Sequence, residues 1–232
     1  SMPAWYSTSS ATQLPAPAAH SCTRGRAVAG SVAGGAYVPD CSDLPALVNA
    51  KRMAYLHYCD NETIGGVEFT GQIEAMSAAF DCPVVADMSS NILSRQIDVS
   101  RYGVIYGGAQ KNIGPAGVVL VIIRKDLLER ALSICPSAFE FKTVADNGSM
   151  YNTPPTYSIY IAGLVFEWLM EKGGVAWAEK QAAQKAALLY SCIDSSDFYN
   201  CPVRPADRSR MNVPFTLADE SLNAEFLKRA AE

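Results

Sequence analysis

Four short, mainly apolar segments constrain the fold of this chain most strongly, and three of them are rich in β-branched residues. They lie at Ala54–Tyr58, Val84–Asp87, Val104–Tyr106 and Val118–Ile123. Each is long enough for a buried strand and too short for a buried helix. Helical patterns occur near Gln72–Phe80 and Asp126–Leu132. Strands that alternate with helices predict an α/β fold with a mainly parallel sheet and flanking helices.

The second half of the chain has a different pattern. Two longer helices are predicted at Tyr157–Lys172 and Val175–Ser195, and the Gly173–Gly174 pair between them is typical of a helix C-cap. A further strand at Met211–Leu217 and a helix at Leu222–Ala231 are predicted to begin another layer.

Composition excludes several classes of function. The chain has 232 residues, 49% hydrophobic and 18% charged, which is enough to bury a sizeable core. A net charge of -4 with scattered arginines gives no basic surface for nucleic acid. No apolar run is long enough for a membrane span. Residues 1–36 are rich in Ala, Ser, Pro and Gly, predict a disordered or linker segment, and lack the features of a secretory signal.

Cysteine and histidine usage also narrows the chemistry. The seven cysteines form no CxxC pair, and with only two histidines the chain offers little for a zinc site or a Ser/His/Asp triad. We therefore expect no metal. The odd, irregularly spaced cysteines favour reduced thiols and a cytoplasmic location.

A lysine and an aspartate stand at two of the predicted strand ends. Lys111 lies in a turn bracketed by glycines between two apolar segments, and Asp87 ends the segment Val84–Asp87. Open α/β sheets bind ligands beyond the carboxyl ends of their strands, so the two side chains can share a pocket. Pyridoxal phosphate needs such a pair: a lysine for covalent attachment and a carboxylate beside its ring nitrogen. The alternatives are a lysine exposed on a loop and an aspartate that caps a helix or turn.

Four blocks in order resemble the phosphoserine aminotransferase family, a class-V, fold-type-I group of pyridoxal-phosphate enzymes. The central block is VVADMSSNILSRQIDVSRYGVIYGGAQKNIGPAGVVLVIIRKDLL, at residues 84–128. The other three are LHYCDNETIGGVEF at 56–69, DNGSMYNTPPTYSIY at 146–160 and NCPVRPADRSRMNVPF at 200–215. The resemblance covers roughly residues 37–232. It implies part of a large cofactor-binding domain at 37–198 and the start of a small C-terminal domain at 199–232.

The resemblance also implies roles for individual residues. Lys111 matches the lysine that bonds covalently to pyridoxal phosphate, and Asp87 matches the partner of the ring nitrogen. Thr63 matches the residue whose hydroxyl contacts the ring oxygen, with an ordinary strand-end threonine as the alternative. Gln110 matches a contact to the cofactor phosphate, with a solvent-facing polar residue as the alternative.

Asn152 and Thr153 match residues that reach the cofactor phosphate of a neighbouring subunit. The resemblance thus implies a homodimer whose sites are completed in trans. A simple turn before the helix that follows Pro154–Pro155 would explain these residues equally well.

The implied activity is amino transfer between glutamate and 3-phosphohydroxypyruvate, which yields phosphoserine and 2-oxoglutarate in serine biosynthesis. The family's N-terminal and C-terminal parts have no counterpart in the sequence, so an incomplete or inactive fragment is expected. Two alternatives stay open: another fold-type-I enzyme that acts on a different small amine, and a non-catalytic remnant that folds or pairs with an intact subunit.

Overall fold

The computed structural model describes residues 31–32, 35–36, 42, 44–50 and 53–232. The predicted linker at 1–36 therefore lies almost entirely outside the described residues. Its described part consists of two paired two-residue strands, β1 (Ser31–Val32) and β2 (Gly35–Ala36).

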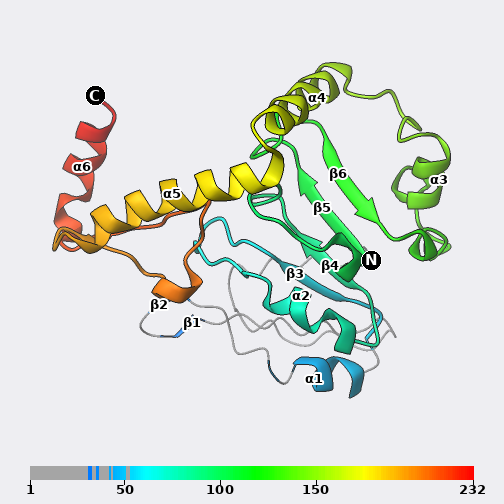
Figure 1. The fold of residues 1–232 in the computed structure, drawn as a ribbon, viewed down its shortest axis with the longest axis horizontal. Helices are drawn as coiled ribbons and strands as arrows, with labels where there is room; N and C mark the ends of the chain where they lie inside the picture. The colour runs from blue at the N-terminus through cyan, green and yellow to red at the C-terminus, as the bar shows by residue number, and fades with distance from the viewer. Residues whose placement is uncertain (1–30, 33–34, 37–41, 43, 51–52) are drawn as a thin grey trace.

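A four-stranded sheet forms the centre of the molecule (Figure 1). Its strands are β3 (Leu56–Cys59), β4 (Val84–Asp87), β5 (Val104–Gly108) and β6 (Val119–Ile123), in that spatial order. The strands β3, β4 and β5 run parallel, whereas β6 pairs antiparallel with β5. The predicted α/β fold with a mainly parallel sheet is confirmed.

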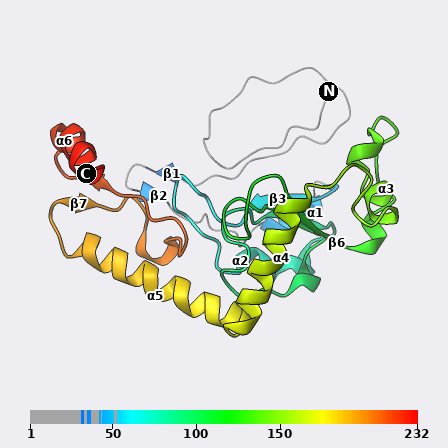
Figure 2. The ribbon, with the colours of Figure 1, turned by 90° about the horizontal axis from the view of Figure 1, so that it is seen from above.

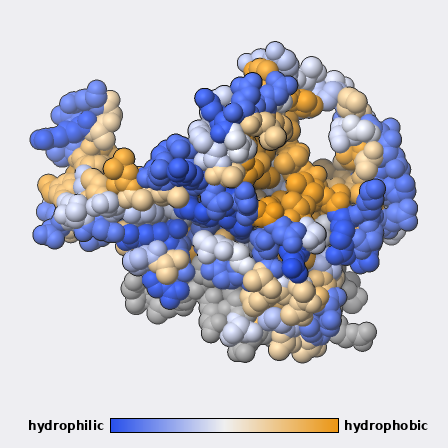
Figure 3. Space-filling view, in the orientation of Figure 1, coloured by the Kyte–Doolittle hydropathy of each residue, from blue (hydrophilic) through white to orange (hydrophobic). Residues whose placement is uncertain are grey.

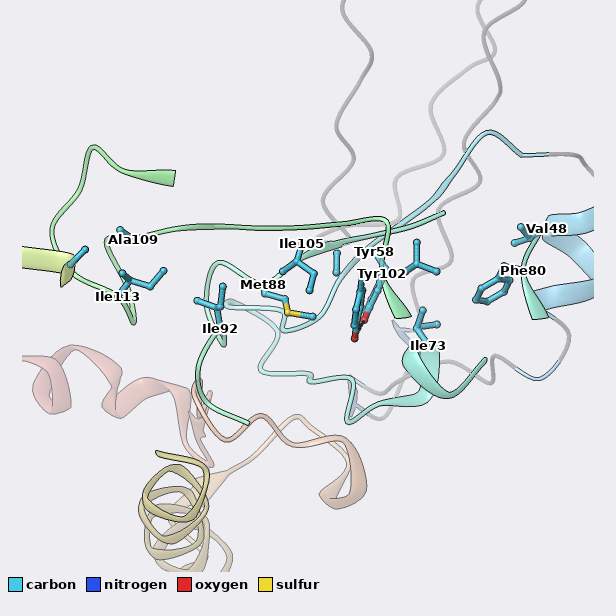
Figure 4. Close-up of a cluster of buried hydrophobic side chains, with 13 residues drawn as sticks. Val48, Tyr58, Ile73, Phe80, Met88, Ile92, Tyr102, Ile105, Ala109 and Ile113 are labelled. Carbon is cyan, nitrogen blue, oxygen red and sulfur yellow. Dashed lines mark hydrogen bonds between the residues drawn. The ribbon is translucent and has the colours of Figure 1, made fainter. Parts of the chain in front are cut away.

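One face of the sheet is the buried core. Tyr58, Ala86 and Ile105 alternate onto this face from three neighbouring strands, as the period of two requires. The same cluster contains Ile73 of the helix α2 (Gln72–Met76), Phe80, which follows a 3-10 turn at Ser77–Ala79, and Val48 of the short helix α1 (Leu44–Ala50). Figure 4 shows Tyr58 and Tyr102 side by side in this cluster, with Met88 and Ile105 next to them.

Two expectations for the sheet region are wrong. The predicted helix at Asp126–Leu132 is only a 3-10 turn at Lys125–Leu127. Short helices need a packed apolar face, and Leu132 is exposed instead. The strand β6 was expected to be buried, but it has a single neighbour in the described sheet and Val119 is 63% exposed.

Two long helices lead away from the sheet. After the short helix α3 (Phe141–Asp146) come α4 (Thr156–Glu171) and α5 (Gly174–Asp194), as the sequence predicts. Gly173 precedes α5 with a φ of 110°, a left-handed conformation that favours glycine. Figures 1 and 2 both show α5 running from α4 toward the C-terminal end of the chain.

The C-terminal part forms a small second cluster at the far end of α5. It contains the paired strands β7 (Tyr199–Asn200) and β8 (Thr216–Leu217) and the helix α6 (Asn223–Ala230). The helix agrees with the prediction, but the strand predicted at Met211–Leu217 is limited to its last two residues. Ser209 Oγ accepts hydrogen bonds from the backbone N–H groups of Met211 and Asn212. These two N–H groups are therefore not free to pair with a neighbouring strand.

Candidate functional site

The carboxyl ends of β3, β4 and β5 carry the predicted site residues. Asp87 is the last residue of β4, and Lys111 follows β5 after a short turn. Thr63 follows β3 and accepts a hydrogen bond from Lys111 Nζ at 2.8 Å. Because parallel strands end at one edge of the sheet, three segments far apart in the sequence meet there.

Lys111 is exposed, and its amine has no carboxylate within ion-pair distance among the described residues. The positive charge of Lys111 opposes the effect of burial on the pKa of Glu62, which burial raises above its ordinary value. An accessible amine beside a hydroxyl can react with an aldehyde.

Asp87 lies on the half-buried face of the sheet and is held from two directions. Its Oδ1 accepts from the backbone N–H of Ser89 at 2.9 Å and from the Ser89 hydroxyl at 2.6 Å. Gly108 N–H donates in turn to Ser89 Oγ at 3.3 Å. Tyr106 lies opposite Asp87 in the neighbouring strand, and its hydroxyl shares a hydrogen bond with this carboxylate. A carboxylate oriented in this way can hold a protonated ring nitrogen.

The other predicted residues are more loosely placed. Gln110 is exposed next to Lys111. Asn152 and Thr153 are exposed in the connection between α3 and α4. Within the described residues neither hydrogen bonds to Lys111, Asp87 or Thr63, so this structure of one chain does not bring them to the site.

Three residues around Asp87 were missed in the sequence: Ser89, Tyr106 and His57. The spacing Asp87-x-Ser89 is typical of a turn in which an aspartate caps the backbone two residues on, and it could have identified Ser89. Tyr106 and His57 depend on strand register. Asp87 pairs with Tyr106 across β4 and β5, and a single sequence does not specify that register.

A buried polar network supports the loop that carries Thr63. Asn61 donates to Ser90 Oγ at 2.8 Å and to Asn212 Oδ1 at 2.7 Å, which joins the loop to the C-terminal segment. Glu68, fully buried, accepts from the backbone N–H of Arg210 at 2.9 Å. The loop is therefore held by residues about 150 positions away in the sequence.

Two pockets in the described part of the chain lie elsewhere. One is lined by Val48, Asn49, Met53, Asp81 and Cys82, and the other by residues between Thr70 and Arg101. The described residues contain no cluster of histidine, cysteine and acidic side chains arranged for a metal ion. They also contain no helix with the length and apolar character that a bilayer span requires.

The residues at the strand ends fit pyridoxal phosphate. The fit rests on three observations: an accessible amine at Lys111, a hydroxyl 2.8 Å from it at Thr63, and an acid at the end of the adjacent strand whose orientation is fixed by Ser89.

Comparisons with known proteins agree with this geometry. A phosphoserine aminotransferase from Burkholderia vietnamiensis is 64% identical over 177 residues, which are 76% of this chain and 48% of that protein. The solved phosphoserine aminotransferase from Bacillus circulans subsp. alkalophilus is 41% identical, with a TM-score of 0.70 over 76% of this chain and 48% of that one. A structure described as pyridoxal-phosphate-bound phosphoserine aminotransferase from Trichomonas vaginalis is also 41% identical, with a TM-score of 0.70 over 76% of this chain and 50% of that one.

The chain spans about half the length of the curated relatives it matches. The sequence profile described as aminotransferase class-V matches residues 13–231, which is most of the chain. This chain therefore belongs to the class-V aminotransferase family.

Proposed function

We propose that the protein to which this chain belongs is a pyridoxal-phosphate-dependent phosphoserine aminotransferase. The single observation that carries the proposal is Lys111 Nζ, accessible and 2.8 Å from Thr63 Oγ1, at the sheet edge where Asp87 ends the neighbouring strand. The relatives at 41 to 64% identity, named as phosphoserine aminotransferases, support the substrate class. The reaction would be amino transfer between glutamate and 3-phosphohydroxypyruvate, which gives phosphoserine and 2-oxoglutarate for serine biosynthesis.

Each side chain has a separate task in this proposal. When bound, pyridoxal phosphate supplies an electron sink for a substrate that loses its Cα proton. Lys111 would hold the cofactor through Nζ, and its amine would accept and return that proton. Asp87 accepts a hydrogen bond from the ring nitrogen and keeps it protonated. Thr63 directs its hydroxyl at the ring oxygen, and Gln110 binds the cofactor phosphate.

We further propose a homodimer in which Asn152 and Thr153 reach the partner's cofactor phosphate. Their exposed positions and the stiff Pro154–Pro155 pair that follows them support this role. Exposed apolar side chains on β6 and α4 offer surface for association. Figure 3 shows such side chains gathered between α4 and α3, over the β6 side of the sheet.

The domain boundaries belong to the same proposal. Residues 37–198 would be part of the large domain and 199–232 the start of the small one. Support for a second unit comes from a buried cluster apart from the core of the sheet, in which Tyr199 and Val213 pack on the end of α5, at Ala186, Tyr190 and Ile193. Because these α5 residues lie before position 199, the cluster joins the two proposed domains at their boundary. The free thiols of Cys59, Cys82, Cys135, Cys192 and Cys201 support a cytoplasmic location.

An activity assay tests the proposal. The chain, alone and joined to the remaining half of a relative, is loaded with pyridoxal phosphate and assayed with glutamate and 3-phosphohydroxypyruvate. We expect amino transfer in the joined protein and a strong preference for the phosphorylated keto acid over pyruvate. Equal rates with both keto acids would favour an enzyme for a different small amine. Cofactor binding without turnover in the joined protein would favour a non-catalytic remnant.

A further inference from the structure

The half-buried face of the sheet holds a row of polar side chains that the proposed reaction does not use. The strand register aligns Cys59, Asp87 and Tyr106 across β3, β4 and β5. His57 lies on the same face, two residues before Cys59. Its ring stacks on that of Tyr106 with centroids 6.0 Å apart and planes inclined by 20°, and His57 Nε2 lies 3.0 Å from Tyr106 Oη.

Counting protons fixes the direction of these hydrogen bonds. A tyrosine hydroxyl has one proton, and an ionised carboxylate only accepts. Tyr106 therefore donates to Asp87, and its oxygen is left to accept. Because Tyr106 Oη accepts, the hydrogen on His57 must sit on Nε2.

The charges on this face agree with that direction. Burial lowers the pKa of His57 below its ordinary value, while the Asp87 carboxylate opposes the shift, so the ring is neutral near neutral pH. Burial raises the pKa of Tyr106, and so do the charge of Asp87 and the hydrogen bond between Tyr106 and Asp87. The Tyr106 hydroxyl therefore keeps its proton. Burial and the nearby carboxylates of Asp87 and Glu62 raise the pKa of Cys59 to about 12, which keeps the thiol neutral.

We propose that Tyr106 and His57 are positioning residues for Asp87, in a chain of hydrogen bonds that runs from His57 Nε2–H to Tyr106 Oη and from the Tyr106 hydroxyl to the Asp87 carboxylate. Ser89 also donates to this carboxylate, through its backbone N–H and its hydroxyl. The Asp87 carboxylate is therefore held by donors from two segments, which fixes its orientation. The proposal rests on the proposed function, because the orientation of Asp87 decides how well its carboxylate can accept a hydrogen bond from the ring nitrogen of the cofactor.

The first test needs no cofactor. With only two histidines in the chain, ¹H–¹⁵N NMR with a His20→Gln variant assigns the His57 ring unambiguously. We expect a neutral ring with a hydrogen-bonded Nε2–H resonance in the native chain. In Tyr106→Phe this resonance should be lost to solvent exchange, and the ¹³C resonance of the Asp87 carboxyl should shift. An Nδ1–H ring in the native chain, or both resonances unchanged in Tyr106→Phe, would overturn the proposal.

The second test measures affinity for pyridoxal phosphate. A hydrogen bond to a charged group is typically strong, so Tyr106→Phe should weaken binding roughly tenfold. His57→Leu should weaken it less, and His57→Gln, which keeps a donor, should restore near-native affinity.

Tyr58→Phe is the matched control, because Tyr58 donates to the Asp60 carboxylate on the opposite face of the same strand at 2.9 Å. It should leave cofactor affinity unchanged. Native affinity in Tyr106→Phe, or an equal loss in Tyr58→Phe, would contradict the positioning role. A native chain that binds no cofactor would count against the proposed function, and the NMR test would then decide this proposal on its own.

Discussion

The hydroxyl of Thr63 has a partner in the structure, Lys111, and a second partner in the proposed function, the cofactor. In the chain without ligand, Thr63 Oγ1 holds the amine at 2.8 Å, and in the proposed function the same hydroxyl turns to the cofactor. Thr63→Val keeps the shape and removes the oxygen. Because one hydrogen bond contributes about 0.5–1.5 kcal/mol, we expect a loss of about two- to tenfold in pyridoxal phosphate affinity, measured by fluorescence titration.

Thr70→Val is the control for that variant, since Thr70 is exposed and, among the described residues, its hydrogen bonds are those with Gln72 in its own turn. It should bind the cofactor as the native chain does. A Thr63→Val chain with native affinity would remove Thr63 from the site.

His57 makes folding stability depend on pH. Burial lowers its folded pKa below the ordinary 6.5, so the unfolded chain binds the proton more readily. The stability contribution is fully present above about pH 6.5 and is lost as pH falls through the folded pKa. Urea unfolding between pH 7.5 and 5 should therefore show a smaller pH dependence in His57→Gln than in the native chain. Parallel curves would show that His57 titrates alike in both states.

At the scale of elements, a buried ion pair ties the β3 end to the segment after β4. Arg95 donates to both oxygens of Asp60, at 2.9 and 2.8 Å, and both side chains are buried. Burial alone would lower the pKa of Arg95, but Asp60 outweighs it and raises the pKa above the ordinary value. Removing one partner leaves a buried charge unpaired. Arg95→Met should therefore reduce the free energy of unfolding by about 3–5 kcal/mol, measured in urea.

Arg101→Met is the matched control, because the Arg101–Asp98 pair is about half exposed on both sides. Its unfolding midpoint should stay within error of the native value. A similar loss of unfolding free energy in the two variants would mean that burial does not make the Asp60–Arg95 pair more important for stability than an exposed pair.

Gly66 joins the Thr63 loop to the C-terminal segment. Its φ is +67°, and an added Cβ would overlap with the ring of Pro214. Gly66→Ala therefore meets both backbone strain and a clash, and we expect a loss of about 2–4 kcal/mol in unfolding free energy. Gly148→Ala has a comparable positive φ, at +58°, but has open space around the Cβ, so it isolates the clash. Equal losses in the two variants would show that Pro214 yields freely.

The same elements show what the sequence can predict. The strands at Val84–Asp87 and Val104–Gly108 and both long helices follow from local apolar patterns and glycine caps. The segments Asp126–Leu132 and Met211–Leu217 fail because their outcome depends on distant partners. In the first segment, Leu132 is exposed and does not pack on the core. In the second, the backbone N–H groups of Met211 and Asn212 donate to the side chain of Ser209. Lys111 and Asp87 can be predicted because they stand at the ends of apolar segments. Tyr106 and His57 cannot, because their place beside Asp87 depends on the register between strands.

At the scale of the whole molecule, the exposed apolar side chains should cause self-association. Val119, on β6, is 63% exposed, and Tyr157, Tyr160 and Met170 on α4 are also exposed. Sedimentation velocity should show concentration-dependent association that Val119→Lys weakens at least tenfold. Leu188→Lys, at a position on α5 that is 77% exposed, is the control and should associate as the native chain does. If both variants associate normally, the β6 surface is not part of the contact.

Covalent attachment of pyridoxal phosphate at Lys111 is the central claim, and borohydride trapping tests it most directly. The purified chain is incubated with pyridoxal phosphate, reduced, digested and mapped by mass spectrometry. We expect the reduced cofactor on the peptide that contains Lys111, at near one equivalent, with Lys125 and Lys172 unlabelled. In Lys111→Ala the label and the visible absorbance band should both disappear. Labelling spread over several lysines, or unchanged in Lys111→Ala, would contradict the account.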